Sequence, residues 1–208
     1  MLALRELRII FTSNMVSKLP FVFKFLMGCM AFIALNLGSS AQEALLPPFD
    51  LQWGEKPEKL LKWASEKQLK VTVKVTDEDP RLKVIGVAPT SGLLPNHKAH
   101  ALEARYHEGK LFEVSVHHGA AHSDPKYTVN YFNELKSLLA VKYGMFSPNN
   151  KQQNKTGEGV RKSVAYHVEP VSGVLLLLVL SELEDAESGM HSARFSLIYR
   201  NQNIIPKR

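Results

Sequence analysis

Apolar residues recur at helical spacing in two stretches of the chain. Between positions 57 and 67 they form one face behind Pro57, a residue that suits the first turn of a helix, so a helix is predicted from Pro57 to about Lys67. A second helix is predicted to begin after Asp124, which can cap it, with Pro125 at its first position. Gly144 is a good terminator for this helix.

Most of the remaining apolar residues alternate with polar ones, as in strands that bury one face. The run VLLLLVL at 174–180 is instead apolar on both faces, which predicts a central strand covered on both sides or one that meets another subunit. The predicted strands are 70–75, 82–87, the two strands of a hairpin over 99–118, 160–168, 174–183 and 192–199.

The order of these elements is helix, four strands, helix, three strands. Hairpin-like connections favour an α+β fold with a mainly antiparallel sheet of about six to seven strands and the two helices packed on one face. A loose duplication, in which each half is a helix followed by strands, is also compatible with this order.

The register of the hairpin over 99–118 can be partly derived from its alternating pattern. A tight two-residue turn at 108–109 would put the apolar residues of its two strands on opposite faces, so that turn is rejected. Two registers with a bulge keep these residues on one face. One of them pairs Leu102 with Val114, the other sets Arg105 opposite Glu113, and the sequence does not choose between them.

The segment 145–159 (MFSPNNKQQNKTGEG) is polar and contains few large apolar residues, which predicts a mobile loop. The last residues, 201–208, are expected to form a tail. With 45% hydrophobic and 22% charged residues, the composition is that of a globular protein, and residues 42–208 are predicted to form a single α+β domain.

The N-terminal stretch, residues 1–41, has the features of a secretory signal peptide. A basic segment ends at Lys24, an apolar run follows over 25–37, and small residues precede a cleavage point after Ala41. The run is shorter than the roughly 20 residues that span a bilayer, so no stable membrane span is expected after cleavage. A retained helix that anchors the chain is the alternative, and Met15 is a second candidate start of translation.

The lone cysteine, Cys29, lies within this apolar run, so the mature chain would contain none. Export without disulfides is typical of a bacterial envelope protein, which predicts a periplasmic or secreted location. Removal of residues 1–41 lowers the net charge from +6 to +3, because four basic residues and one acid are lost. Such a weak and interspersed charge predicts no nucleic-acid partner.

Four histidines are candidate ligands for a metal ion. In both registers that remain open, His100 and His118 share a face at the open end of the hairpin, whereas His117 points the other way. With His97 or His122 they would make a three-ligand zinc or copper site that leaves one position free. The competing interpretation is that these residues only finish a strand.

No complete catalytic constellation is present in the sequence. Ser123 lies between His122 and Asp124, but the side chains of adjacent residues diverge and cannot form a triad. This favours a protein that is not an enzyme, without deciding the question, and no cofactor is expected apart from the alternative zinc or copper. Trp53, beside Gly54, is the candidate for contact with a ligand or partner.

Two short motifs, FDLQWG at 49–54 before the first helix and LLAVKYG at 138–144 at the end of the second, resemble those of small uncharacterised bacterial exported α+β domains that open with a Trp-Gly pair. The resemblance implies an α+β fold in the envelope and brings no catalytic residues. We therefore expect an exported, non-enzymatic interaction module that presents its sheet, or the segment 145–159, to another envelope protein or to a second copy. A metal-binding protein or metal-dependent hydrolase that uses the histidines is the alternative, and a small-ligand carrier is a third hypothesis.

Overall fold

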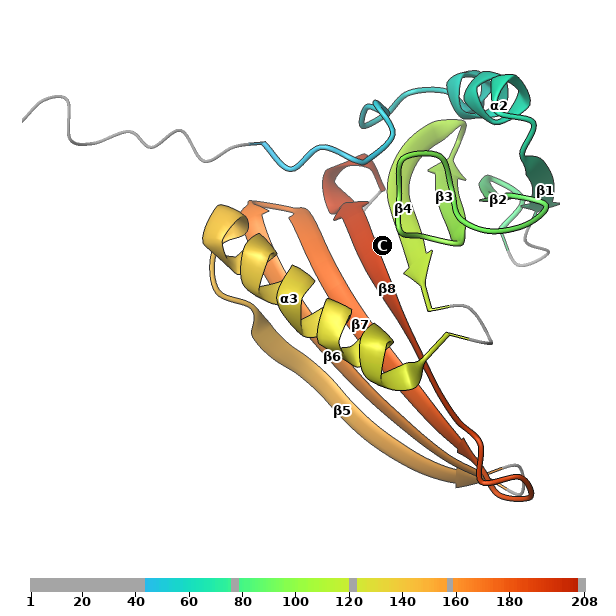
Figure 1. Ribbon diagram of the computed structural model, residues 1–208. Coiled ribbons are helices and arrows are strands. Elements are labelled where there is room, and N and C mark those ends of the chain that lie inside the picture. Colours follow the sequence, from blue (N-terminus) through green and yellow to red (C-terminus); the bar gives the residue numbers. More distant parts are fainter. Residues whose placement is uncertain (1–43, 76–78, 120–122, 157–158, 206–208) are drawn as a thin grey trace, which may run out of the picture. The chain divides into compact units, whose positions relative to one another are not determined.

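The computed structural model describes residues 44–75, 79–119, 123–156 and 159–205 (Figure 1). The predicted signal peptide at 1–41 and the candidate ligand His122 lie outside these residues. Gln42–Arg208 form one compact unit.

The described chain forms two α-helices and eight strands, which confirms the α+β class and adds one strand to the largest number expected. In chain order the elements are α2 (Pro57–Glu66), β1 (Lys70–Val75), β2 (Leu82–Ala88), β3 (Ala101–His107), β4 (Lys110–His118), α3 (Pro125–Tyr143), β5 (Ser147–Thr156), β6 (Gly159–Val171), β7 (Val174–Asp185), β8 (His191–Asn201) and the 3-10 turn η2 (Gln202–Ile204).

The predicted loop at 145–159 is wrong, because most of this segment is strand β5. The strand pairs with β6 in antiparallel register, with Gln152 opposite Ser163. β5 lies at the edge of the sheet, where polar side chains stay in water on both faces while the backbone still makes its ladder of hydrogen bonds. Pro148 is tolerated there because an edge strand has one unpaired side. The strand was not predicted because its side chains do not alternate between apolar and polar. Its pairing with β6 is made by backbone hydrogen bonds.

The strands lie in the order β1-β2-β3-β4-β8-β7-β6-β5 (Figure 1), and this order contains the same structural unit twice. Each unit is one helix followed by four strands that pair in sequence order, and the two last strands, β4 and β8, pair antiparallel with each other. The loose duplication considered from the sequence is therefore present at the level of topology. The eighth strand, β5, completes the second unit.

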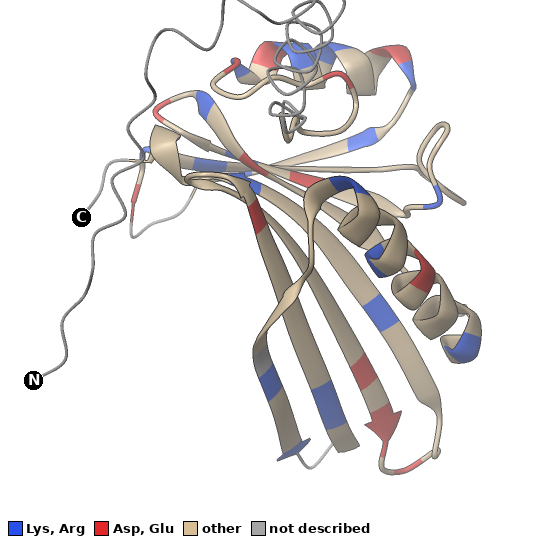
Figure 2. Cartoon of the chain, turned by 90° about the vertical axis from the view of Figure 1, so that its left-hand side faces the viewer, with Lys and Arg blue, Asp and Glu red and all other residues tan. Residues whose placement is uncertain are grey.

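Both helices pack on one face of the continuous sheet. The register places Val116 opposite Leu197 and Leu197 opposite Leu178, so side chains from both units share this face. Leu60 of α2 and Phe132 of α3 belong to the two apolar clusters built on it. We call this side the helix face and the other side the open face; Figure 2 shows α3 on one side of strands β5–β8.

The hairpin β3–β4 combines one of the two predicted registers with a two-residue turn. Arg105 lies opposite Glu113, which confirms one of the two open registers. The turn is nevertheless the two-residue type that was rejected: Glu108 and Gly109 both have positive φ, 51° and 74°, as a tight hairpin turn requires. The register shifts next to Arg105, and the residue left over is Phe112. This bulge restores one apolar face after a turn that would otherwise split it.

The buried hydroxyl of Tyr106 provides a test of the core. The ring is fully buried, its hydroxyl has no hydrogen-bond partner in the described part of the chain, and burial raises the pKa of the phenol above its usual value. Replacing Tyr106 with Phe should raise the free energy of unfolding by about 1 kcal/mol, because an unpaired buried hydroxyl costs desolvation without a return. Urea unfolding measures the change, and Tyr127→Phe, at a 56% exposed position, is the control. A loss of stability in Tyr106→Phe would mean that the hydroxyl is bonded.

Candidate functional site

The open face carries a row of half-buried apolar side chains on three neighbouring strands. On β7, Leu175, Leu177 and Val179 alternate with the buried residues of the helix face. Ile198 on β8 lies opposite Leu177, and Ala165 on β6 lies opposite Val179. We call these five residues the apolar strip. The clusters that hold α2 and α3 are built on the helix face, so neither helix, as far as the described residues show, covers the strip.

The apolar strip explains the run VLLLLVL in part. β7 lies inside the sheet, and its helix-face residues, among them Leu176 and Leu178, are fully buried beneath α3. Its other residues are equally apolar although they are only half-buried. Contact of this second face with another chain, one of the two alternatives drawn from the sequence, stays a prediction.

Ion pairs neutralise the two acidic residues in the middle of the open face. Glu113 is 3% exposed and lies between arginines of the two neighbouring strands. Its carboxylate accepts a hydrogen bond from Nε of Arg200 and lies 3.3 Å from Nε of Arg105. Arg105 also donates to Glu103 at 3.0 Å. Both carboxylates are thus already engaged by guanidinium groups of the same face.

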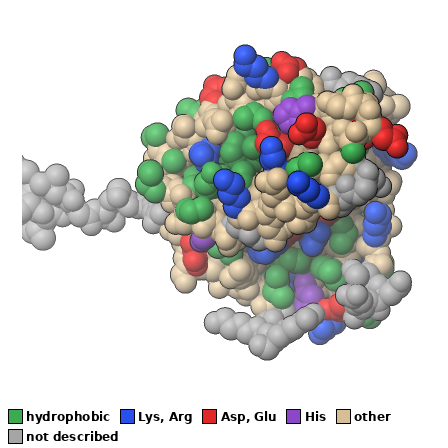
Figure 3. Space-filling view, turned by 90° about the horizontal axis from the view of Figure 1, so that it is seen from below, with side chains coloured by type: hydrophobic (Ala, Val, Ile, Leu, Met, Phe, Trp, Pro, Cys, Tyr) green, Lys and Arg blue, Asp and Glu red, His purple; other side chains and the backbone are tan. Residues whose placement is uncertain are grey.

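Four further cations on the open face have no acidic partner in the described ranges. Arg161 on β6 and Arg194 on β8 are exposed beside the apolar strip, and Lys70 and Lys74 are exposed on β1. Because the two central acids are paired and these four cations are not, the face has an excess of positive charge. In the view from below, Lys, Arg, Asp and Glu side chains all lie among hydrophobic ones at the surface (Figure 3).

A histidine and a serine lie side by side on the open face. Nδ1 of His117 is 2.8 Å from Oγ of Ser196, which lies opposite it on β8. Burial lowers the pKa of His117, while the charge of Glu103 raises it. No carboxylate in the described residues forms an ion pair with this imidazole, so the third member of a nucleophilic triad is missing from the arrangement.

The histidines predicted to bind a metal ion lie in different surroundings. His118 is buried, stacks on Phe195 at 4.5 Å between ring centres, and donates from Nδ1 to the carbonyl of Lys98 at 2.9 Å. The ring of His97 instead packs on Phe49 at 4.3 Å, and Nδ1 of His100 is buried without a partner in the described chain.

Burial lowers the pKa of all three imidazoles, that of His118 to about 4. Within the described residues, no group of three or more His, Cys, Asp or Glu side chains could hold a metal ion. The zinc or copper hypothesis therefore rests on the sequence pattern alone, with His122 outside the description.

Trp53 has a packing role in this structure. Its ring is partly buried against the cluster under α3, and its Nε1 donates to the carbonyl of Leu45 at 2.8 Å. This bond ties the segment before α2 to the core. The predicted contact of Trp53 with a ligand or partner stays a prediction.

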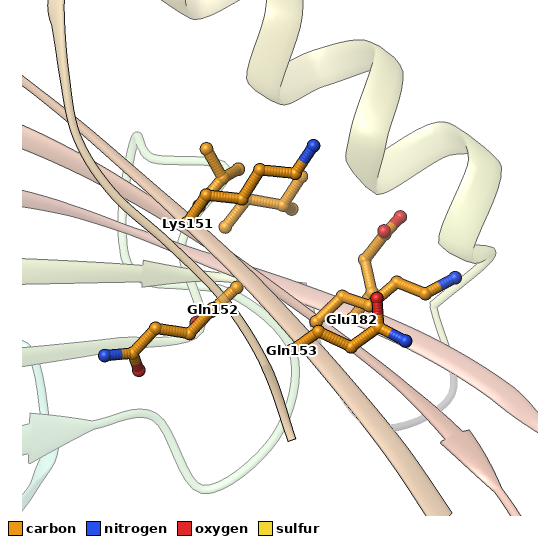
Figure 4. A pocket seen from close by; sticks show the side chains of 8 residues that line it. Lys151, Gln152, Gln153 and Glu182 are labelled. Atoms are coloured by element: carbon orange, nitrogen blue, oxygen red, sulfur yellow. The ribbon is translucent and has the colours of Figure 1, made fainter. Parts of the chain in front are cut away.

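A hollow on the helix face lies at the far ends of β5, β6 and β7 (Figure 4). It encloses about 600 Å³ above Val164 and Leu180, and the side chain of Gln152 points away from that of Lys151 at its border. A smaller hollow of about 290 Å³ shares Lys162 and Glu182 with it. The lining of the larger hollow contains both Lys and Glu side chains, among them Lys151, Lys162 and Glu182. These charged groups do not form a cluster of one chemical kind around a common point.

No known protein family, curated protein or solved structure matches this chain. In the described part of the chain, no helix has the length and apolar character needed to cross a membrane.

Proposed function

We propose that this protein is an exported, non-enzymatic binding module whose open face docks another envelope protein that presents acidic side chains. The observation that carries the proposal is the apolar strip, which lies half-buried on the side of the sheet opposite both helices. Export rests on the N-terminal sequence pattern. The sheet is therefore the proposed binding element. The segment 145–159 is not a separate binding element, because most of it forms an edge strand of the same sheet.

The arrangement of apolar and charged residues on the open face matches that of a protein interface. Protein interfaces bury an apolar centre within a polar rim, and arginine is enriched among the residues that contribute most to affinity. Here the apolar strip is the centre. Arg161 and Arg194 lie beyond its Val179 end along the strands, and the pair Arg105–Glu113 lies level with its Leu175 end, on β3 and β4. A row of half-buried side chains spread over three strands suits a folded partner better than a small ligand, which prefers a concave site.

The charge of the open face favours an acidic partner over a second copy. Arg161, Arg194, Lys70 and Lys74 form no ion pair with an acid among the described residues, so carboxylates of a partner would be new ion-pair acceptors. A second copy docked through the same face would bring the same cations, and like charges placed opposite each other across an interface are costly. Self-association through this face is therefore the weaker hypothesis.

Site-specific photo-crosslinking tests the proposal in the cells that produce the protein. A photoreactive residue at position 198, in the apolar strip, should give one discrete adduct with another protein. The same residue at position 138, on α3 and 62% exposed, is the control and should not give that adduct.

The partner identified in this way can then be purified and its affinity measured. The double substitution Arg161→Glu and Arg194→Glu is expected to weaken binding at least about tenfold and to slow association, because rim charges steer the encounter. Lys62→Glu on α2, whose side chain is 79% exposed, should change neither. Equal adducts from positions 198 and 138, or an affinity that the double substitution leaves unchanged, would refute the proposal, and an adduct between two copies would assign the face to self-association.

A further inference from the structure

A second surface feature lies on the helix face, between the C-terminal half of α3, the residues 145–146 that follow it, and the strand β6. It is a groove of about 570 Å³, which falls within the range of about 300–1,000 Å³ typical of small-molecule sites. Ala140, Phe146 and Tyr166 line its half-buried part, Val141 and Met145 form its exposed rim, and Lys136 is its cation.

The rim of the groove exposes large apolar side chains to solvent. Val141 is 90% exposed, Met145 is 85% exposed, and the neighbouring Leu138 is 62% exposed. Isolated apolar side chains are normal on a protein surface, but a contiguous group beside a groove marks a binding site. Methionine suits such a rim because its unbranched side chain adapts to different shapes.

Lys136 brings an unneutralised charge to this apolar groove. Its Nζ lies 4.3 Å from the ring centre of Tyr166 and 5.8 Å from that of Phe132, both of which stabilise a cation. The positions three and four residues away on α3 are Phe132, Asn133, Leu139 and Ala140, none of them acidic. No described acidic side chain forms an ion pair with Lys136, so the cation is held by aromatic faces beside an apolar surface.

We propose that this groove binds an apolar chain that ends in a carboxylate, such as a fatty acid. The carboxylate would accept a hydrogen bond from Nζ of Lys136, and the chain would lie on Ala140 and Phe146 between the rim residues Val141 and Met145. One cation beside a lining that is mostly apolar, with Ser137 as its other polar residue, matches one anionic group on an apolar molecule. The groove is on the helix face, so this inference is independent of the docking proposed for the open face.

Isothermal titration calorimetry with decanoate, below its micelle concentration, tests the inference on the protein as recovered from the expressing cells. Saturable binding at one site is expected. Lys136→Gln should weaken it at least about tenfold, the effect of losing one hydrogen bond to a charged group. Lys126→Gln, an exposed lysine near the start of the same helix, is the matched control and should leave the affinity unchanged.

Two further arms distinguish binding in this groove from nonspecific adsorption of an apolar chain. Ala140→Phe should fill the groove and abolish decanoate binding, with unchanged thermal unfolding as evidence that the variant folds. Decyltrimethylammonium, which has the same chain with a cationic end, should bind more weakly than decanoate to the unaltered protein. The proposal is overturned if both ligands bind equally, if Lys136→Gln has no effect, or if the protein binds vesicles of anionic phospholipid but not monomeric decanoate.

Discussion

Replacing Phe195 with alanine is expected to lower the free energy of unfolding by about 3–5 kcal/mol, the range found when a buried phenylalanine is removed from a packed core. Phe195 is 1% exposed and lies on β8 opposite His118 of β4, where the two helix-and-strand units join. Its ring stacks on His118 and lies 5.6 Å and 5.7 Å from the ring centres of Tyr131 and Phe132 on α3. One side chain thus joins the seam of the sheet to the longer helix.

Urea unfolding, followed by the loss of far-ultraviolet circular dichroism, measures this change. Val141→Ala is the control, because its side chain is 90% exposed and such substitutions usually change stability by less than about 0.5 kcal/mol. A loss below about 1.5 kcal/mol for Phe195→Ala would mean that α3 and the sheet close over the cavity, since the cost depends on how far the surroundings relax. It would also argue against the aromatic cluster as the element that unites the two units.

Stability is expected to fall as the pH drops through the titration range of His118. Burial lowers the pKa of this imidazole from 6.5 to about 4, so the folded protein binds its proton less readily than the unfolded chain does. The neutral form is also the one that fits, because Nδ1–H donates to the carbonyl of Lys98 and the ring stacks on Phe195. The contribution is complete above about pH 6.5 and is lost progressively between pH 6.5 and 4, and the total loss is about 3 kcal/mol.

Other groups also shift the pKa of His118. The charges of the nearby imidazoles His97, His100 and His117 each lower it further, whereas the bond to the carbonyl of Lys98 raises it. Urea unfolding at a series of pH values between 7.5 and 4 measures the slope, and His118→Phe should remove most of it while keeping an aromatic ring on Phe195. An unchanged slope in His118→Phe would assign the acid sensitivity to other groups.

Local signals predicted the helices well because their ends depend on neighbouring residues. The carboxylate of Asp124 accepts from the backbone N–H of Lys126 at 2.9 Å, as its position before Pro125 predicts. Strand β5 was not predicted because it depends on pairing with another strand and not on the pattern of its own side chains. Its pairing with β6 is made by the backbone, and the side chains of an edge strand need not alternate in polarity.

The candidate site was only partly predictable. His117 and His118 are successive residues of a strand and face opposite sides of the sheet, as the alternation of a strand predicts. The apolar run of β7 predicts a central strand. The pattern does not distinguish a second face that is covered by a helix from one that meets another subunit or stays exposed to solvent. Lys136 and Tyr166 are 30 positions apart, and no spacing in the sequence relates them.

The sequence by itself determined the α+β class, both helix starts, a choice of two registers for the hairpin β3–β4 and a central strand that is apolar on both faces. Each of these follows from contacts between residues near one another in the chain or from a strict alternation along it. Only the tertiary structure decided that β4 pairs with β8, that both helices cover the same face, and that an apolar strip is left on the other side. Those features depend on how the two similar units pair with each other. That pairing is made by backbone hydrogen bonds and side-chain packing between segments far apart in the sequence, so no local pattern predicts it.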